Sequence, residues 1–319
     1  MSEAQVEPIV FENRAGLKLF GILHTPLQAR AGAPAILLLS PGIKMRVGPN
    51  LLYRSITDRL VGMGYSVFRF DFFGLGDSEG ELSETRLADV YNHIEVGRYV
   101  EDTLDAMDFM QREYGIGKFI LGGLCGGAVS GLLTAGRDPR AVGLLGLGLT
   151  VVLASAAADP LKYMPQGQAK LSRQAYFMRA LRPSSWLRLL TLQSDFKLLW
   201  ASFSTPFKKL RPARGAQPEA GERQVQMDNR NPLIPKAVFP VLDRGGKILL
   251  IFSGADRLLD EFQEKFAAGY KAALARHADG FQVRVVKDAN HIFSQRAWRD
   301  EMLDDTERWL NRHFPSGNS

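Results

Sequence analysis

The feature of this 319-residue chain that most constrains its fold is a regular alternation of short apolar runs with longer amphipathic segments. The apolar runs are rich in β-branched, leucine and aromatic residues, which is typical of strands buried on both faces. Strands that alternate with helices form a mostly parallel sheet, because each helix returns the chain to the same edge. We therefore expect an α/β fold with helices on both faces of the sheet.

The runs predict eight strands. Two flank a turn signal at 12–16 and should form an opening hairpin, and six follow along the chain. The expected strands are 9–11, 17–24, 35–40, 65–71, 118–124, 142–150, 247–253 and 281–286. The expected helices are about 50–63, 85–113, 126–136, 260–277 and 296–313.

Residues 151–240 interrupt this alternation, with several prolines and amphipathic pieces in place of strands. Because the segment lies between two expected strands, it is an insertion and not a terminal domain. We expect 1–150 and 241–319 to form the sheet domain, and 151–240 to form a mainly helical cap over its edge.

The net charge of +6 is unevenly distributed. The segment 151–240 contains 14 Lys and Arg against five Asp and Glu, so it carries +9 and the rest of the chain about −3. Apolar side chains interleave with these charges. Trp186, Leu190, Trp200 and Phe203 are candidates for binding an acyl chain. The alternative is an amphipathic cap that only packs on the sheet and turns a basic face to solvent.

Composition excludes several classes of protein. The single cysteine rules out an internal disulfide framework. No apolar stretch reaches the length of a membrane span, and the acidic start lacks a signal peptide, so we expect a cytoplasmic protein. No metal-binding spacing and no nucleic-acid-binding motif appears, and we expect neither a metal nor a cofactor.

The most informative motif is Gly-Gly-Leu-Cys-Gly-Gly at 122–127, between an expected strand and an expected helix. A G-x-C-x-G turn at this place strains the backbone and exposes the central side chain at the carboxyl edge of the sheet. The N-terminus of the following helix favours a thiolate there. Cys125 is therefore a candidate nucleophile, and the alternative is a buried structural cysteine in a packing turn.

A base and an orienting acid follow in the order that such a nucleophile requires. Asp256 comes after the strand 247–253, and His291 comes after the strand 281–286. Since parallel strands end at one edge, both should lie near Cys125. None of the other four histidines follows a strand in this way, whereas Asp260 and Asp288 compete with Asp256 for the acid role.

Acyl transfer also needs donors for the oxyanion. The amide of Gly126 follows the nucleophile, and the amide of Ile43 lies in the Pro-Gly loop after the strand 35–40; the alternative for this loop is a plain turn. Residues 76–80 also match G-x-S-x-G, but they lie in an acidic loop with no apolar helix behind Ser78, which argues against Ser78 as nucleophile.

Together these motifs resemble the α/β-hydrolase superfamily. The resemblance rests on SPGIKMRVGPN, YSVFRFDFFGLGDSEG, GGLCGGA, SGAD and DANHIF, and it covers about 8–150 and 241–314. More narrowly, the chain is similar to the serine-aminopeptidase-like branch and to bacterial hydrolases found with exosortase systems. It departs from the superfamily's usual serine at Cys125, a substitution shared with dienelactone-hydrolase-like members and some thioesterases.

The resemblance implies an acyl hydrolase, an esterase or thioesterase with a Cys125–His291–Asp256 triad and an acyl-cysteine intermediate. Two alternatives stay open. One is an acyltransferase, since amines attack thioesters readily. The other is a non-catalytic acyl-binding protein of this fold. The basic segment is expected to meet an acidic partner, either an acyl carrier protein, coenzyme A or an anionic lipid surface.

Overall fold

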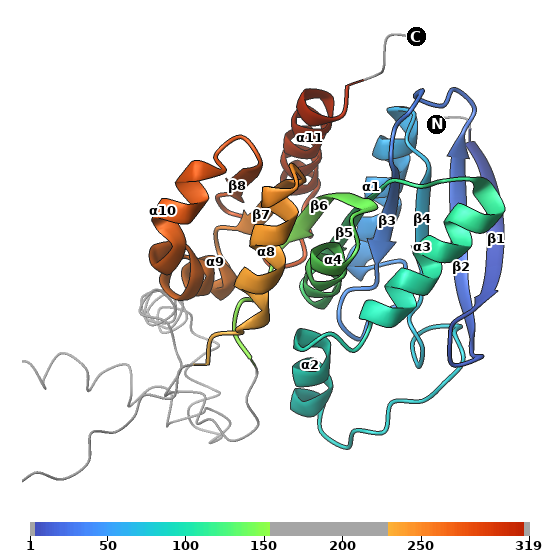
Figure 1. The fold of residues 1–319 in the computed structure, drawn as a ribbon, viewed down its shortest axis with the longest axis horizontal. Helices are drawn as coiled ribbons and strands as arrows, with labels where there is room; N and C mark the ends of the chain where they lie inside the picture. Colours follow the sequence, from blue (N-terminus) through green and yellow to red (C-terminus); the bar gives the residue numbers. More distant parts are fainter. Residues whose placement is uncertain (1–3, 154–228, 316–319) are drawn as a thin grey trace, which may run out of the picture. The chain divides into compact units, whose positions relative to one another are not determined.

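The computed structural model describes residues 4–153 and 229–315, which form an eight-stranded sheet flanked by helices (Figure 1). The strand order is β1-β2-β4-β3-β5-β6-β7-β8, antiparallel from β1 to β4 and parallel from β4 to β8. The strands are β1 (Ala4–Glu12), β2 (Lys18–Pro26), β3 (Ala35–Leu39), β4 (Val67–Phe70), β5 (Phe119–Leu124), β6 (Ala141–Leu147), β7 (Lys247–Ser253) and β8 (Phe281–Val286). The expected mostly parallel eight-stranded sheet is confirmed.

Helices cover both faces of the sheet (Figure 1). One face carries α1 (Leu52–Gly62) and α11 (Arg296–His313), and the other carries α3 (Val100–Tyr114), α4 (Gly126–Arg137) and α8 (Leu233–Asp243). The sequence of β3 shows why both faces are apolar: Leu37 and Leu39 pack on the α3 side, whereas Ile36 and Leu38 pack on the α1 side. The remaining helices are α2 (Leu87–Glu95), α9 (Arg257–Phe262) and α10 (Ala268–Arg276), the last two joined by a π-helical turn.

The single helix expected over 85–113 is wrong, because the structure has α2 and α3 in its place. Gly97 lies between them with φ 106, a backbone conformation that glycine adopts without a steric penalty. Its N–H donates to Ile94 O at 3.1 Å and closes α2. The helical spacing of apolar residues continues across this break through Val96 and Tyr99, which is why periodicity did not reveal it.

Most of the expected cap, 151–240, falls outside the described residues, so its helical character stays a prediction. Its two ends are described, and Val152 pairs with Arg230 in an antiparallel bridge. Helix α8 begins inside the expected cap and packs against α4 and β7, with Ile234 and Val238 buried. Residues 233–240 therefore belong with the sheet domain.

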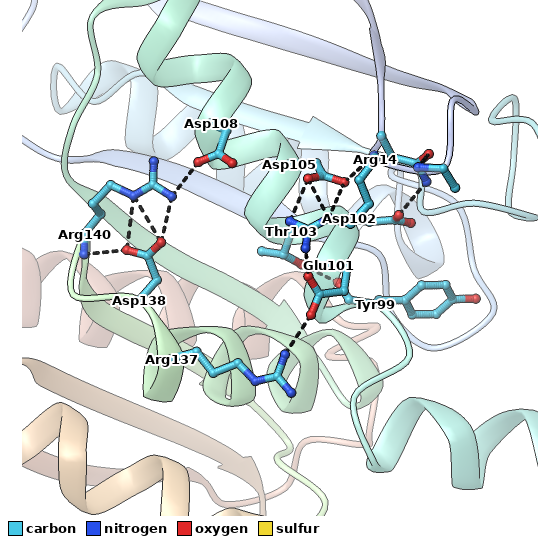
Figure 2. A network of polar contacts seen from close by, with 12 residues as sticks. Arg14, Tyr99, Glu101, Asp102, Thr103, Asp105, Asp108, Arg137, Asp138 and Arg140 are labelled. Atoms are coloured by element: carbon cyan, nitrogen blue, oxygen red, sulfur yellow. Dashed lines mark hydrogen bonds and ion pairs between the residues drawn. The ribbon is translucent and has the colours of Figure 1, made fainter.

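Arginines from three separate segments reach acidic side chains of α3 (Figure 2). The pairs are Arg14 of the hairpin turn with Glu101 and Asp105, Arg137 of α4 with Glu101, and Arg140 of the α4–β6 turn with Asp108. These pairs are largely exposed, and such pairs contribute little to stability. They join the hairpin turn, the end of α4 and the α4–β6 turn to α3.

A buried ion pair joins the loops that follow β3 and β4. Asp71 has no exposed side-chain surface, and its carboxylate pairs with the Arg46 guanidinium. The same carboxylate accepts hydrogen bonds from the backbone N–H groups of Arg46 (2.5 Å) and Asp77 (3.2 Å). Since Ile43 lies in the loop with Arg46, Asp71 fixes the backbone on which one of the two candidate oxyanion amides lies.

We expect Asp71→Asn to lower the free energy of unfolding by about 3 kcal/mol, because it removes the buried charge of the pair and leaves Arg46 with only the exposed carboxylate of Asp77. Asp77→Asn is the matched control. Asp77 also pairs with Arg46, at 2.6 Å, but its side chain is 58% exposed. Its replacement should cost less than about 1 kcal/mol. Urea denaturation followed by circular dichroism measures both, and equal losses would contradict the structural role given to Asp71.

Candidate active site

Cys125 lies at a sharp turn between β5 and α4. It directly follows Leu124, the last residue of β5, and directly precedes Gly126, the first residue of α4. Its backbone has φ 55 and ψ −116, and its N–H donates to Leu147 O at 2.8 Å. The thiol is therefore half-buried at the carboxyl edge of the sheet, at the N-terminus of a helix whose dipole favours negative charge.

Two glycines of the motif are required by close packing at this turn. A methyl group added at Gly127 would overlap the carbonyl oxygen of Leu39 at the end of β3. One added at Gly123 would lie 2.5 Å from the carbonyl carbon of Gly127. The first turn of α4 can approach β3 and β5 this closely only because both positions lack a side chain.

His291 and Asp256 lie at the same edge, on the loops after β8 and β7. His291 Nδ1 is 2.6 Å from Asp256 Oδ2. The Cys125 side chain is a second hydrogen-bond partner of the His291 ring. The three predicted residues are thus brought together. The acid that contacts His291 is Asp256, and not Asp260 or Asp288.

The surroundings favour the charged imidazolium. The hydrogen bond to Asp256 and then the hydrogen bond to Cys125 raise the pKa of His291 to about 10, against the opposing effect of burial. A proton is therefore held on the ring between a carboxylate and a thiol. This arrangement can supply a thiolate as nucleophile and an imidazolium as acid.

The other four histidines are engaged elsewhere. His24 contacts Arg69, His93 pairs with Glu84, His277 pairs with Asp243, and His313 contacts Gln282. The serine of the second G-x-S-x-G match also has a structural place. Ser78 Oγ donates to Asp71 O at 2.6 Å and accepts the Phe20 N–H at 2.9 Å, which ties the loop after β4 to β2.

The loop with Ile43 lies against the start of α4. A methyl group added at Gly126 would be 3.0 Å from Gly42 Cα and 3.1 Å from Gly42 N. Gly42 has φ 60, and the turn closes through the Lys44 N–H to Pro41 O at 3.0 Å. Ile43 and Gly126, the two predicted oxyanion residues, are therefore on neighbouring backbone segments.

Tyr53 of α1 bridges these two segments, a role that no pattern in the sequence predicted. Its buried hydroxyl donates to Leu39 O at 2.7 Å and accepts the Leu124 N–H at 2.8 Å. Burial raises the pKa of this phenol, so it remains a neutral donor. The Tyr53 side chain thus joins the end of β3 to the end of β5. The loop of Ile43 follows the first of these strands, and Cys125 follows the second.

Three more residues beside the site were missed. Tyr91 of α2 lies against the loop that contains Ile43, with its ring 3.0 Å from the position of a methyl group added at Gly42. Gly148 has φ 55 and lies beside the His291 ring. Thr150 Oγ1 is 3.8 Å from Cys125 Sγ. Thr150 was expected to end a strand, but β6 ends at Leu147. No pattern along the chain predicts contacts such as these three, which join distant segments.

Other predicted features lie outside this site or outside the described residues. Trp186, Leu190, Trp200 and Phe203 all fall in the part of the chain that is not described. Within 4–153 and 229–315, no three side chains of His, Cys, Asp or Glu are grouped to hold a metal ion. No helix of the described parts has the length and apolar character needed to cross a membrane.

Comparisons with known proteins agree with this fold. A model of the alpha/beta hydrolase family matches residues 39–304. Human monoglyceride lipase is 31% identical over 113 residues, which are 35% of this chain and 35% of the lipase, so the match spans about a third of that curated relative. The narrower resemblance to the serine-aminopeptidase-like branch stays a prediction.

Two solved structures share the fold at low sequence identity. An esterase from Pyrococcus furiosus has a TM-score of 0.55 at 14% identity, covering 97% of this chain and 93% of its own. An esterase domain from Rhodothermus marinus has a TM-score of 0.50 at 19% identity, covering 97% and 99%. Because the family match runs from the end of β3 into α11 and includes the strand ends that hold Cys125, Asp256 and His291, this chain belongs to the alpha/beta hydrolase family.

Proposed function

We propose that this protein hydrolyses acyl esters or thioesters through an acyl-cysteine intermediate, with Cys125 as nucleophile. The observation that carries the proposal is the hydrogen-bonded series Asp256–His291–Cys125, with 2.6 Å between His291 Nδ1 and Asp256 Oδ2. A nucleophile, a base and an orienting carboxylate in contact are the groups that acyl transfer requires.

The proposed reaction has two steps. The Cys125 thiolate attacks the acyl carbon, a carbon–sulfur bond forms, and the bond to the leaving group breaks as the His291 imidazolium gives it a proton. Water then attacks the thioester carbon and loses a proton to His291, and the carbon–sulfur bond breaks to release the acid and restore the thiolate. The amides of Ile43 and Gly126 are proposed to stabilise the oxyanion in both steps.

The names of two similar proteins, monoglyceride lipase and an esterase, support esters as the substrate class. The acyl chain is proposed to lie against Trp186, Leu190, Trp200 and Phe203. The +9 charge of 151–240 supports a substrate or partner that is acidic, such as coenzyme A or an acyl carrier protein.

Acyl transfer is the second candidate, favoured by the cysteine at position 125. Amines attack thioesters more readily than they attack oxygen esters, so an acyl-cysteine suits an acceptor other than water. Adding an amine acceptor to a hydrolysis assay separates the two: hydrolysis predicts that free acid remains the main product, and transfer predicts that the amide replaces it.

We expect Cys125→Ala and His291→Ala each to lower kcat/KM for p-nitrophenyl butyrate by about 10⁴-fold or more, because each removes a group that acts in the bond-breaking steps. Ser78→Ala is the control and should stay within about threefold of wild type. The proposal fails if Cys125→Ala keeps its activity while Ser78→Ala loses it.

The ionisation of His291 gives an independent prediction. NMR titration should find its pKa near 10, and Asp256→Asn should lower it, because the carboxylate is the largest cause of the increase. His24 is the internal control, since burial lowers its pKa below 6.5 in both proteins.

The same shift predicts how stability depends on pH. Because the pKa of His291 is raised above its unfolded value of 6.5, protonation of His291 stabilises the folded state. This contribution is complete below pH 6.5 and is lost as the pH rises to about 10. A His291 pKa that is near 6.5 and insensitive to Asp256→Asn would contradict both the imidazolium and its cause.

A further inference from the structure

We propose that Thr150 is a positioning residue for the nucleophile, with its hydroxyl as a second hydrogen-bond donor to the Cys125 thiolate, beside His291. The inference rests on the proposed function, in which Cys125 is the nucleophile. It starts from the distance of 3.8 Å between Cys125 Sγ and Thr150 Oγ1, which is within hydrogen-bond range for sulfur.

The segment that holds Thr150 contacts the site at two further points. Leu147 O accepts the Cys125 N–H at 2.8 Å. A methyl group added at Gly148 would lie 3.6 Å from Cε1 and 3.7 Å from Nδ1 of His291. Along residues 147–150, Leu147 therefore bonds the backbone of Cys125, Gly148 lies beside the ring of His291, and Thr150 lies beside the sulfur. Thr150 thus belongs to the surroundings of the proposed nucleophile and base.

The position of Thr150 is fixed from both sides. On one side, the Gly148 N–H donates to Ile251 O at 2.8 Å, and φ 55 at Gly148 turns the chain out of β6. On the other side, the Asn231 N–H donates to Val151 O at 2.9 Å. The Thr150 residue is only 8% exposed, so its hydroxyl is held near the sulfur and does not extend into solvent.

The direction of the hydrogen bond depends on the state of the sulfur. A thiolate has no proton and can only accept, so the hydroxyl must donate to it. A thioester sulfur carries no charge and accepts weakly, so the same hydroxyl favours the thiolate over the acylated form. Thr150 would therefore stabilise the nucleophile before attack and the leaving thiolate during release of the acyl group.

The experiment measures the alkylation rate of Cys125 by iodoacetamide against pH, from about 4 to 10, by intact-mass spectrometry of the full chain. Because the chain has one cysteine, the adduct that is absent from Cys125→Ala reports on Cys125. We expect Thr150→Val, which keeps the shape and removes the donor, to move the midpoint of the rate profile up by about one pH unit. Thr150→Ser should restore most of the shift.

Thr103→Val is the matched control, because Thr103 is also buried and its hydroxyl donates to Tyr99 O at 2.8 Å, away from the thiol. It should leave the midpoint unchanged. An unchanged midpoint in Thr150→Val, or an equal shift in Thr103→Val, would overturn the role of Thr150. Alkylation needs no turnover, so failure of the proposed function would appear in the ester assay and not in this profile.

Discussion

The candidate active site depends on one close approach, that of the first turn of α4 to the ends of β3 and β5. Gly127 lies under the carbonyl of Leu39, and Gly123 lies against Gly127. This contact forces the intervening Cys125 to φ 55 and ψ −116, a conformation that costs an L-residue about 1–3 kcal/mol. Hydrogen bonds from the Cys125 N–H to Leu147 O and from the Leu124 N–H to the Tyr53 hydroxyl hold it there.

The chemistry that we propose depends on the sulfur atom that Cys125 places at this strained turn. A serine hydroxyl needs a base to remove its proton during attack, whereas a thiol beside His291 can transfer its proton beforehand. The hydrogen bonds to Asp256 and Cys125 keep the imidazolium protonated, and the helix N-terminus favours the anion. Position 125 therefore places the sulfur beside a protonated base, which is the arrangement that the proposed attack uses.

Much of the fold and of the candidate site could be predicted from the sequence because both depend on local rules. Parallel strands end at one edge, so the residues after β5, β7 and β8 had to lie near one another, and Cys125, Asp256 and His291 do. The glycines around Cys125 indicated the close approach. Conversely, the break at Gly97 was hidden because apolar spacing continues across it.

The contacts of Tyr53, Tyr91 and Thr150 could not be predicted, for a different reason. Each joins segments far apart in the chain: Tyr53 reaches Leu124, Tyr91 reaches Gly42, and Thr150 reaches Cys125. Such contacts depend on the residue at which each strand or helix ends. Strand β6 ends three residues earlier than its apolar run. They became visible only once the strand ends were placed in three dimensions.

The most direct test of the account locates the acyl group on the chain. The protein is incubated with a stoichiometric amount of an activated acyl ester, quenched with acid, digested and mapped by tandem mass spectrometry. The account predicts one acyl group as a thioester on Cys125, removable by hydroxylamine and lost in Cys125→Ala. An acyl group on Ser78 or another serine, or turnover without any acyl adduct, would contradict it.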